Sequence, residues 1–266
     1  MAALRRSLSL SFSGCGWLAS FHLGVADVLL RARCISAVSP LAGASGGSLV
    51  AAGLACGLAP RDMQRQLMAV AAGFRDREEE GSMGDVWGRL EPRLRDTLDA
   101  MLPADAAERC SGRLSVALTR TRAPCGVWLV DQFRTRDELL QALVCSSFIP
   151  WYLAPGWTRL FRGQPVVDGG FMELYPVVPG ALAVCPYPYY GALRGVPVDI
   201  GPIHAGVLHL IAESLVPAAD ERVEQQFAHG QAAATTWLEA HHPRLPLQPI
   251  SCTAPRPLRP AVASAA

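Results

Sequence analysis

The segment from 41 to 49 constrains this chain most, because it places a serine between glycines where an apolar run gives way to a helix-like pattern. Residues 43 to 47 are Gly-Ala-Ser-Gly-Gly, the pattern of a nucleophile elbow. Glycines two residues before and two after Ser45 relieve the crowding of a sharp turn, so the hydroxyl can project. With 24 glycines in the chain the pattern arises readily by chance, so it predicts a catalytic serine only where other features support it.

Length and composition favour one large globular domain. A chain of 266 residues that is 50% hydrophobic can bury a sizeable core without a second domain. The net charge of +1 gives no electrostatic footprint for nucleic acid, so apolar or neutral partners are expected and nucleic acid is not. We expect the domain to span residues 1–242 and the proline-rich residues 243–266 to form a disordered tail.

Missing residue types exclude several chemistries. The chain has no lysine and no asparagine, which excludes Schiff bases, lysine P-loops, Ser-Lys dyads, Cys-His-Asn triads and N-glycosylation. Its eight cysteines lie at irregular spacing, with no CxxC pair and no zinc-ligand pattern. We therefore expect free thiols in a reducing, cytoplasmic setting, with no metal and no cofactor.

Hydrophobic periodicity predicts alternating strands and helices. The order strand, loop, helix, strand, elbow, helix at the start is that of a parallel sheet covered by helices, an α/β fold. Strands are expected at 7–13, 36–42, 114–118, 127–133, 166–167 and 181–185. Helices are expected at 19–32, 46–56, 60–74, 85–102, from the N-cap Thr135 to about 145, at 204–216 and at 220–241.

Two segments could be taken for targeting or membrane elements. No acidic residue precedes Asp27, as in a transit peptide, but Leu8, Leu10 and Phe12 alternate with serines, which favours a strand. The uncharged stretch 34–60 is long enough to span a bilayer. Its proline and its glycines favour a folded turn and helix instead, so no transmembrane helix is predicted.

A second glycine loop, Gly14-Cys15-Gly16-Trp17-Leu18-Ala19, follows the first expected strand. Its GxGxxA spacing satisfies a dinucleotide fingerprint, but that site needs an acid at the end of the next strand, and residues 36–42 contain none. The alternatives are an oxyanion hole, with amides near Cys15 and Gly16 facing an intermediate on Ser45, or a glycine turn that only connects strand and helix.

Ser45 needs a base, and none of the six histidines lies in a convincing motif: His22, His204, His209, His229, His241 and His242. Asp168 is the better candidate, because it ends a short apolar run and is followed by Gly169 and Gly170. An acid at the end of a buried strand is exposed to a site, and the glycines allow close approach of another backbone. The alternative is an ordinary Asp-Gly turn.

In this order and at these separations, the segments 13–18, 43–47 and 168–170 resemble the patatin-like phospholipase domain, over about residues 7–185. The resemblance implies a three-layer α/β/α fold with a mainly parallel central sheet and a Ser-Asp dyad of Ser45 as nucleophile and Asp168 as base. It also implies an oxyanion hole and a set of motif glycines. The oxyanion hole would be Gly14, Cys15, Gly16 and Trp17, and the motif glycines Gly43, Gly46, Gly47, Gly169 and Gly170.

The Ser-Gly-Cys-Gly form of the first loop and the segment 146–150 resemble the animal-type branch of that family, which includes adipose triglyceride lipase and adiponutrin. Three departures stand out. The arginine of the plant-type loop is absent, Ala19 replaces the last glycine, and Gly46 stands where many relatives have alanine. The small methyl of Ala19 should leave the loop intact.

The resemblance implies a lipase of lipid esters, acylglycerols first, with phospholipase A or transacylase activity as further possibilities and peripheral contact with a membrane or lipid droplet. Trp151, Tyr152, Leu153, Trp157, Tyr187, Tyr189 and Tyr190 could line an acyl channel, lie on a lipid surface or simply pack. Two other functions remain open: an α/β-hydrolase with a Ser-Asp-His triad, and a catalytically weak lipid-binding or coactivator module.

Overall fold

The computed structural model describes residues 7–36, 38–75, 87–187, 195, 197–201 and 207–241. Its helices and strands follow one another in the alternation that the periodicity predicts. In chain order they are β1 (Ser9–Phe12), η1 (Gly16–Leu18), α1 (Ala19–Arg31), β2 (Leu41–Ala44), α2 (Gly46–Ala55), α3 (Pro60–Arg75), α4 (Leu90–Met101), α5 (Ala106–Cys110), β3 (Leu114–Arg120), β4 (Gly126–Val130), α6 (Arg136–Ser146), β5 (Arg159–Phe161), β6 (Gln164–Val167), β7 (Ala181–Val184), α8 (Val207–Leu215) and α9 (Asp220–His241).

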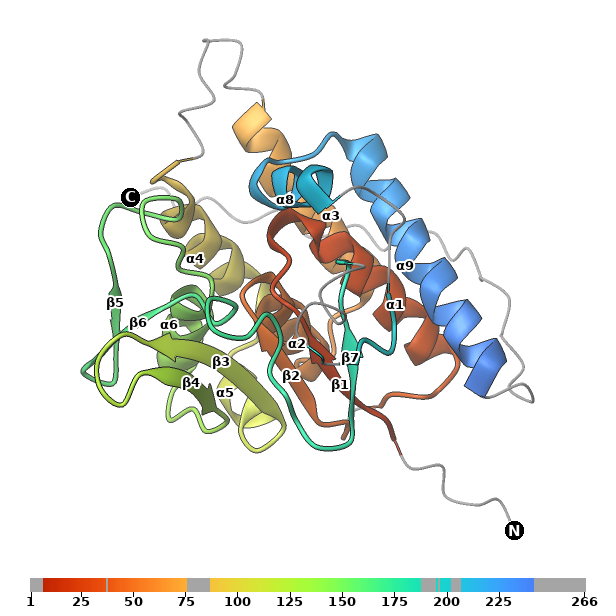
Figure 1. Ribbon diagram of the computed structural model, residues 1–266, viewed down its shortest axis with the longest axis horizontal. Helices are drawn as coiled ribbons and strands as arrows, with labels where there is room; N and C mark the ends of the chain where they lie inside the picture. The colour runs from red at the N-terminus through yellow and green to blue at the C-terminus, as the bar shows by residue number, and fades with distance from the viewer. Residues whose placement is uncertain are drawn as a thin grey trace, which may run out of the picture.

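The described strands form one seven-stranded sheet flanked by helices, which confirms the α/β fold class (Figure 1). The sheet is mixed. Strands β3, β2, β1 and β7 are parallel, as expected for strands joined by helical connections. Strands β4, β6 and β5 add antiparallel pairs beyond β3. The parallel half therefore carries the first glycine loop and the elbow, and the antiparallel half carries Asp168.

Strand β1 is covered on both faces. Leu10 and Phe12 point into the core and are fully buried. Ser11, on the alternate face, is also buried, and its hydroxyl donates to the carbonyl of Pro176 at 2.6 Å. A buried hydroxyl needs such a partner. Ser11 thus lies under the later segment that contains Pro176.

Some expected boundaries were wrong. The strand expected at 36–42 lies at Leu41–Ala44, because Ser36 and Ser39 close a turn in which the Ser36 N–H donates to the Ser39 hydroxyl. Helix α4 begins at Leu90, and residues 87–89 form a turn. Pro92 therefore lies in the first helical turn, where a proline is tolerated. The short elements α5 and β5 were not expected from the sequence.

Helices α1 and α9 cross with their backbones in contact, and Figure 1 shows them side by side. A Cβ atom on Gly24 would lie 2.0 Å from the carbonyl oxygen of Phe227, and one on Gly230 would lie 2.0 Å from that of Phe21. No side chain fits at either position, so the two glycines set the distance between the helices. The last described helix therefore packs directly on the first.

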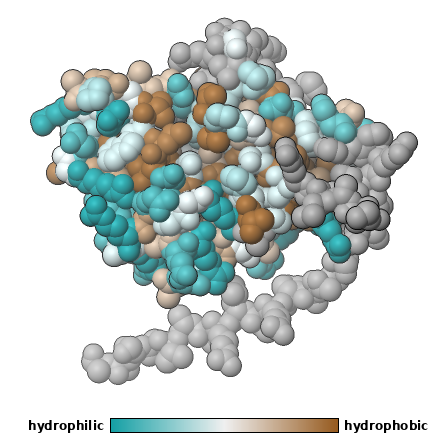
Figure 2. Space-filling model, turned by 90° about the horizontal axis from the view of Figure 1, so that it is seen from below, coloured by the Kyte–Doolittle hydropathy of each residue, from teal (hydrophilic) through white to brown (hydrophobic). Residues whose placement is uncertain are grey.

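The surface mixes hydrophobic and hydrophilic residues, and Figure 2 shows several separate hydrophobic patches on the face seen from below. Scattered exposed hydrophobic residues are normal and need no function by themselves. Among the described residues, no helix combines the length and the hydropathy needed to cross a bilayer. The tail expected at 243–266 lies outside the described residues.

Candidate active site

The register of the sheet brings Ser45 and Asp168 together. Strand β2 pairs with β3 up to Ala44 opposite Ala117, so Ser45 follows at the level of Leu118. Strand β6 runs the opposite way and pairs Val167 with Thr119, so Asp168 follows at the same level. Because β4 occupies the other edge of β3 over these residues, β2 and β6 share one edge and their ends meet there.

Ser45 occupies a strained turn between β2 and α2. Its φ of 51° and ψ of −131° are uncommon for a residue with a side chain and are typical of functional sites. The flanking glycines are sterically required. A Cβ atom on Gly43 would lie 2.5 Å from the carbonyl carbon of Gly47, and one on Gly47 would lie 2.3 Å from the carbonyl oxygen of Ser13. The elbow predicted from the sequence is thus present in the structure.

Ser146, at the end of α6, links the turn at Ser45 to the sheet by hydrogen bonds. Its hydroxyl accepts from the Ser45 N–H at 3.0 Å and donates to the Ala117 carbonyl at 2.7 Å. Its carbonyl accepts from the Gly169 N–H at 2.9 Å. The same side chain and backbone therefore position both Ser45 and the turn after Asp168. The segment 146–150 was noted only as a resemblance, and this role of Ser146 was not predicted, because a serine at a helix end is common.

Asp168 is buried, with only 5% of its surface exposed. Its Oδ1 accepts a hydrogen bond from the Gly170 N–H at 2.7 Å. No described residue donates a well-aligned hydrogen bond to its buried Oδ2. Burial raises the pKa of this carboxyl to about 6, against smaller lowering effects of the Ser45 hydroxyl and the Gly170 N–H. The Oδ2 atom is left to accept a proton, and the group is basic enough to take one near neutral pH.

The first glycine loop lies against the elbow. A Cβ atom on Gly46 would lie 2.9 Å from the Cys15 sulfur and 3.2 Å from the Gly16 nitrogen, so this loop meets the N-terminus of α2. Gly14 donates its N–H to the Leu174 carbonyl at 2.6 Å and is not available to a ligand. The amides of Cys15 and Gly16 remain, beside a helix N-terminus that favours negative charge.

Cys15 is the other potential nucleophile beside the elbow. It is buried, and burial first, then nearby Cys185 and Asp168, raise the pKa of its thiol well above the usual range. A thiol that stays protonated is a poor nucleophile. The Cys15 thiol is therefore not an activated nucleophile.

No histidine with a described side chain hydrogen-bonds Ser45 or Asp168. His22 is fully buried, its Nε2 lies 3.1 Å from the Ser13 carbonyl oxygen, and burial lowers its pKa to about 4, so it is neutral. His241 stacks on Trp237 with ring centroids 4.7 Å apart, and His229 is exposed. His204, His242 and the side chain of His209 lie outside the described residues.

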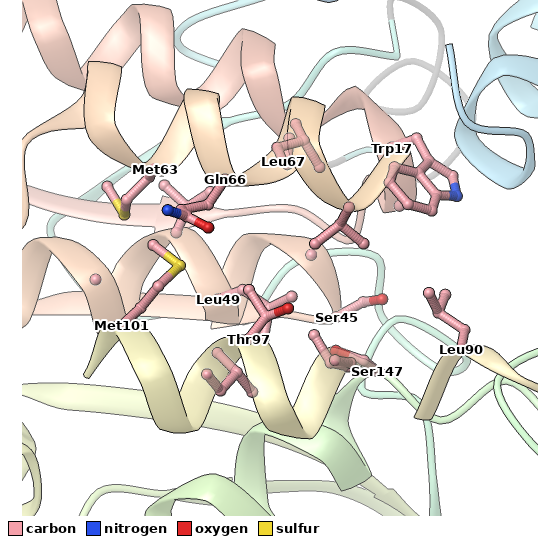
Figure 3. A pocket seen from close by; sticks show the side chains of 18 of the residues that line it. Trp17, Ser45, Leu49, Met63, Gln66, Leu67, Leu90, Thr97, Met101 and Ser147 are labelled. Atoms are coloured by element: carbon pink, nitrogen blue, oxygen red, sulfur yellow. The ribbon is translucent and has the colours of Figure 1, made fainter. Parts of the chain in front are cut away.

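A cavity of about 170 Å³ opens beside Ser45 and runs between α2, α3 and α4. Figure 3 shows Ser45 and Ser147 near one end of it and Met63 and Met101 at the other. Most of its lining is apolar, and no described lining residue is charged. The apolar side chains that these helices place in the lining include Leu49, Val50, Leu67, Val70, Leu94 and Leu98.

Only part of the predicted aromatic channel lines this cavity. Tyr152 and Leu153 do, whereas Trp151 and Trp157 are exposed at the surface and Tyr187 packs against the core. Tyr189 and Tyr190 lie outside the described residues. The sequence did not predict that α4 lines the cavity. Its lining residues form an apolar stripe at helical spacing: Leu90, Leu94, Leu98 and Met101. An apolar stripe on a helix has the same pattern whether it packs in a core or lines a cavity.

No described group of three or more His, Cys, Asp or Glu side chains gathers as it would around a metal ion.

The comparisons with known proteins agree with the geometry. The model of the family described as patatin-like phospholipase matches residues 10–180, most of the chain, and this match includes most of β1, the turn at Ser45 and Asp168. The chain belongs to the patatin-like phospholipase family. It is therefore an enzyme that acts on ester bonds of lipids, as a hydrolase or a transacylase.

Three relatives in this family illustrate its range. Patatin-like phospholipase domain-containing protein 4 of Homo sapiens is 33% identical over 209 residues, 77% of this chain and 79% of the relative. The 1-acylglycerol-3-phosphate O-acyltransferase PNPLA3 of Homo sapiens is 32% identical over 80% of this chain and 46% of its own. The omega-hydroxyceramide transacylase of Mus musculus is 32% identical over 63% of this chain and 28% of its own length. The chain thus spans less than half the length of the last two.

The buried Asp168 predicts two pH dependences of opposite direction. If ionised Asp168 is the base, kcat/KM should rise with pH through about 6. The pKa of Asp168 in the folded state, about 6, exceeds that of an unfolded aspartate, about 3.9, so the folded state binds this proton more tightly. The free energy of unfolding therefore falls as pH rises from about 4 to about 6. Asp168→Asn should therefore gain stability over the parent at pH about 8, by roughly 3 kcal/mol, and not at pH about 4.

Urea unfolding at the two pH values and a pH profile with a soluble ester measure these effects. The exposed Asp131→Asn is the control, with no change expected in either. An activity profile that is flat through pH about 6, or an Asp168→Asn protein that is less stable than its parent at pH about 8, would contradict this account of Asp168.

Proposed function

We propose that this chain is a serine acyl hydrolase that cleaves neutral acylglycerols with a Ser45-Asp168 dyad. The observation that carries the proposal is the convergence of the two residues from the ends of β2 and β6, with Ser45 lining an apolar cavity. The strained turn presents the Ser45 hydroxyl, and the buried carboxylate has one oxygen left to accept a proton. A nucleophile, a base and an acyl-sized apolar space are the parts that ester hydrolysis requires.

The mechanism has two halves. Asp168 takes the proton of Ser45 as its Oγ attacks the ester carbonyl carbon, and the amides near Cys15 and Gly16 stabilise the negative oxygen of the tetrahedral intermediate. Its collapse breaks the carbon–oxygen bond to the alcohol, which receives the proton from Asp168. Water or another alcohol then attacks the acyl-Ser45 ester by the same steps in reverse order. Hydrolysis and transacylation differ only in this second acceptor.

The cavity supports a neutral lipid substrate. Its described lining holds no charged side chain that would pair with a phosphate, and its helical walls suit an alkyl chain. We place acylglycerols first for this reason and phospholipase A activity after them. The names of two relatives include acyl transfer, so transfer to a lipid alcohol is the second candidate for the acceptor step.

Two other functions are less well supported. A Ser-Asp-His triad needs a histidine that hydrogen-bonds Ser45 or Asp168, and no described side chain provides one. The His22 Nε2 instead contacts the Ser13 carbonyl oxygen. A catalytically silent lipid-binding module would have no use for a strained serine beside a buried carboxylate, because such strain lowers stability. Both alternatives remain open to the experiment that follows.

Single substitutions separate these functions. Ser45→Ala should remove esterase activity on a soluble monoester and on emulsified triacylglycerol, and Asp168→Asn should lower kcat by at least about a hundredfold, because general-base catalysis contributes that much. His22→Phe, His229→Ala and His241→Ala should keep kcat within about threefold of the parent, the range expected when no proton transfer is lost. Loss of activity at any histidine favours the triad, and a fully active Ser45→Ala protein rules out the proposed nucleophile.

Filling the far end of the cavity tests where the acyl chain binds. Met101→Trp places a larger side chain in the cavity, so kcat/KM for a palmitoyl ester should fall at least about tenfold relative to a butyryl ester, since a long chain can no longer be buried. Ala100→Trp, on the exposed side of α4, is the matched control and should leave this ratio unchanged. Equal losses for both esters would place the acyl chain elsewhere.

A group of exposed tryptophans at the cavity edge supports contact with a lipid surface. This tryptophan patch consists of Trp87, Trp151 and Trp157, which are 52%, 50% and 73% exposed. Trp151 and Trp157 pack edge to face, and Trp87 packs on Tyr152, which lines the cavity. Trp151 has a φ of 65°, which is strained for a bulky residue. Tryptophan is the side chain best suited to a lipid headgroup region, so the patch would bring the cavity to its substrate.

Removing the patch should separate binding to lipid from chemistry. The double variant Trp151→Ala/Trp157→Ala should lose at least about tenfold in partition onto neutral phosphatidylcholine vesicles, because burial of large aromatic surface is lost. Its kcat/KM on a water-soluble ester should be unchanged. Flotation with vesicles measures the first quantity, with Val38→Ala, another exposed hydrophobic position, as control. Undiminished flotation of the double variant would contradict the assignment.

A further inference from the structure

Ser147 carries an unused polar group in the cavity. Only 8% of its surface is exposed, it lines the cavity beside Ser45, and its hydroxyl has no hydrogen-bond partner among the described residues. A buried hydroxyl without a partner lowers the stability of the folded protein. Such a group in a substrate cavity is expected to find its partner in the ligand.

The other hydroxyls of the cavity lining are already satisfied within the protein, apart from the nucleophile. Thr97 donates to the Arg93 carbonyl at 2.7 Å, and Ser214 donates to the Ile211 carbonyl at 2.7 Å. Tyr152 donates to the Leu215 carbonyl at 2.8 Å. Ser147 therefore differs from them in having its hydrogen-bonding capacity free for a bound molecule.

The geometry of the intermediate indicates which substrate atom it meets. The tetrahedral carbon carries the Ser45 oxygen, the acyl chain, the negative oxygen and the alcohol oxygen. The acyl chain follows the cavity toward Met63 and Met101, and the negative oxygen faces the amides of the first glycine loop. In Figure 3 Ser45 lies between Trp17, from that loop, and Ser147. The alcohol oxygen is the polar atom left for the Ser147 side.

We infer that the Ser147 hydroxyl donates a hydrogen bond to the alcohol oxygen of the ester and so positions the leaving alcohol and, later, the incoming acceptor. The inference rests on the proposed dyad mechanism. Ser147 neither gains nor loses a proton. As the bond from the acyl carbon to the alcohol oxygen breaks, that oxygen keeps the electron pair and receives from Asp168 the proton that Ser45 lost. The Ser147 hydrogen bond stabilises this oxygen while its charge develops.

Leaving groups of different quality test this role. Ser147→Ala should lower kcat/KM about tenfold for a monoacylglycerol, the effect of one lost hydrogen bond. For the p-nitrophenyl ester of the same fatty acid the loss should be less than about threefold, because nitrophenolate leaves without such help. Ser147→Thr keeps a hydroxyl and should restore the monoacylglycerol rate.

Stability measurements on the same variants exclude a purely structural role. Because Ser147→Ala removes an unsatisfied hydroxyl, its thermal midpoint should equal or exceed that of the parent. Gln226→Met is the matched control, since both polar atoms of that buried side chain also lack partners and it lies in α9, outside the lining. It should gain stability with both rates unchanged.

The outcomes are distinguishable. Equal losses on both esters, no loss on either, or a lower thermal midpoint for Ser147→Ala would overturn the role of Ser147. If instead Ser45→Ala hydrolyses either ester as fast as the parent, the dyad mechanism itself fails. The comparison of the Ser147 variants tests the role of Ser147 when the parent cleaves both esters and the Ser45→Ala protein cleaves neither.

Discussion

The turn at Ser45 depends on a steric constraint: two glycines leave no room for a side chain where α2 meets β1 and β2. Any Cβ atom at Gly43 or Gly47 would collide with backbone atoms. This close approach places the N-terminus of α2 at the end of the sheet, next to the first glycine loop. The strained backbone of Ser45, the position of the Cys15 and Gly16 amides beside this turn and the opening of the cavity next to Ser45 all depend on it.

The site is assembled from groups that folding alone would not favour. Asp168 is a carboxyl group taken out of water without a cationic partner among the causes of its shifted pKa. Ser147 is a buried hydroxyl without a hydrogen bond, and Ser45 has an uncommon backbone conformation. Each feature lowers the stability of the free protein. Ser45 and Ser147 line the same cavity, and Asp168 lies beside Ser45. Such a concentration of unfavourable features in one place is expected of a functional site.

The sequence was a good guide where the signal is local. The glycine spacing around Ser45 reports directly on backbone crowding, and Gly169 after Asp168 is required because its Cβ atom would lie 2.2 Å from the Ala117 carbonyl oxygen. Helix α9 was predicted with its observed bounds, Asp220–His241, because its periodicity is long. The antiparallel partners of β3 and the support from Ser146 depend on contacts between distant segments, which no local pattern contains.

The contact between α1 and α9 has a consequence for how the protein is made on the ribosome. Helix α1 leaves the ribosome before α9, and the surface that it presents at Gly24 finds its partner only when α9 is made, about two hundred residues later. The first glycine loop waits as well, since a Cβ atom on Gly16 would lie 2.0 Å from the Ser214 carbonyl oxygen, in α8. Long-range contacts of this kind form late in folding. A nascent chain that already contains both Ser45 and Asp168 therefore still lacks the packing that holds its first glycine loop in place.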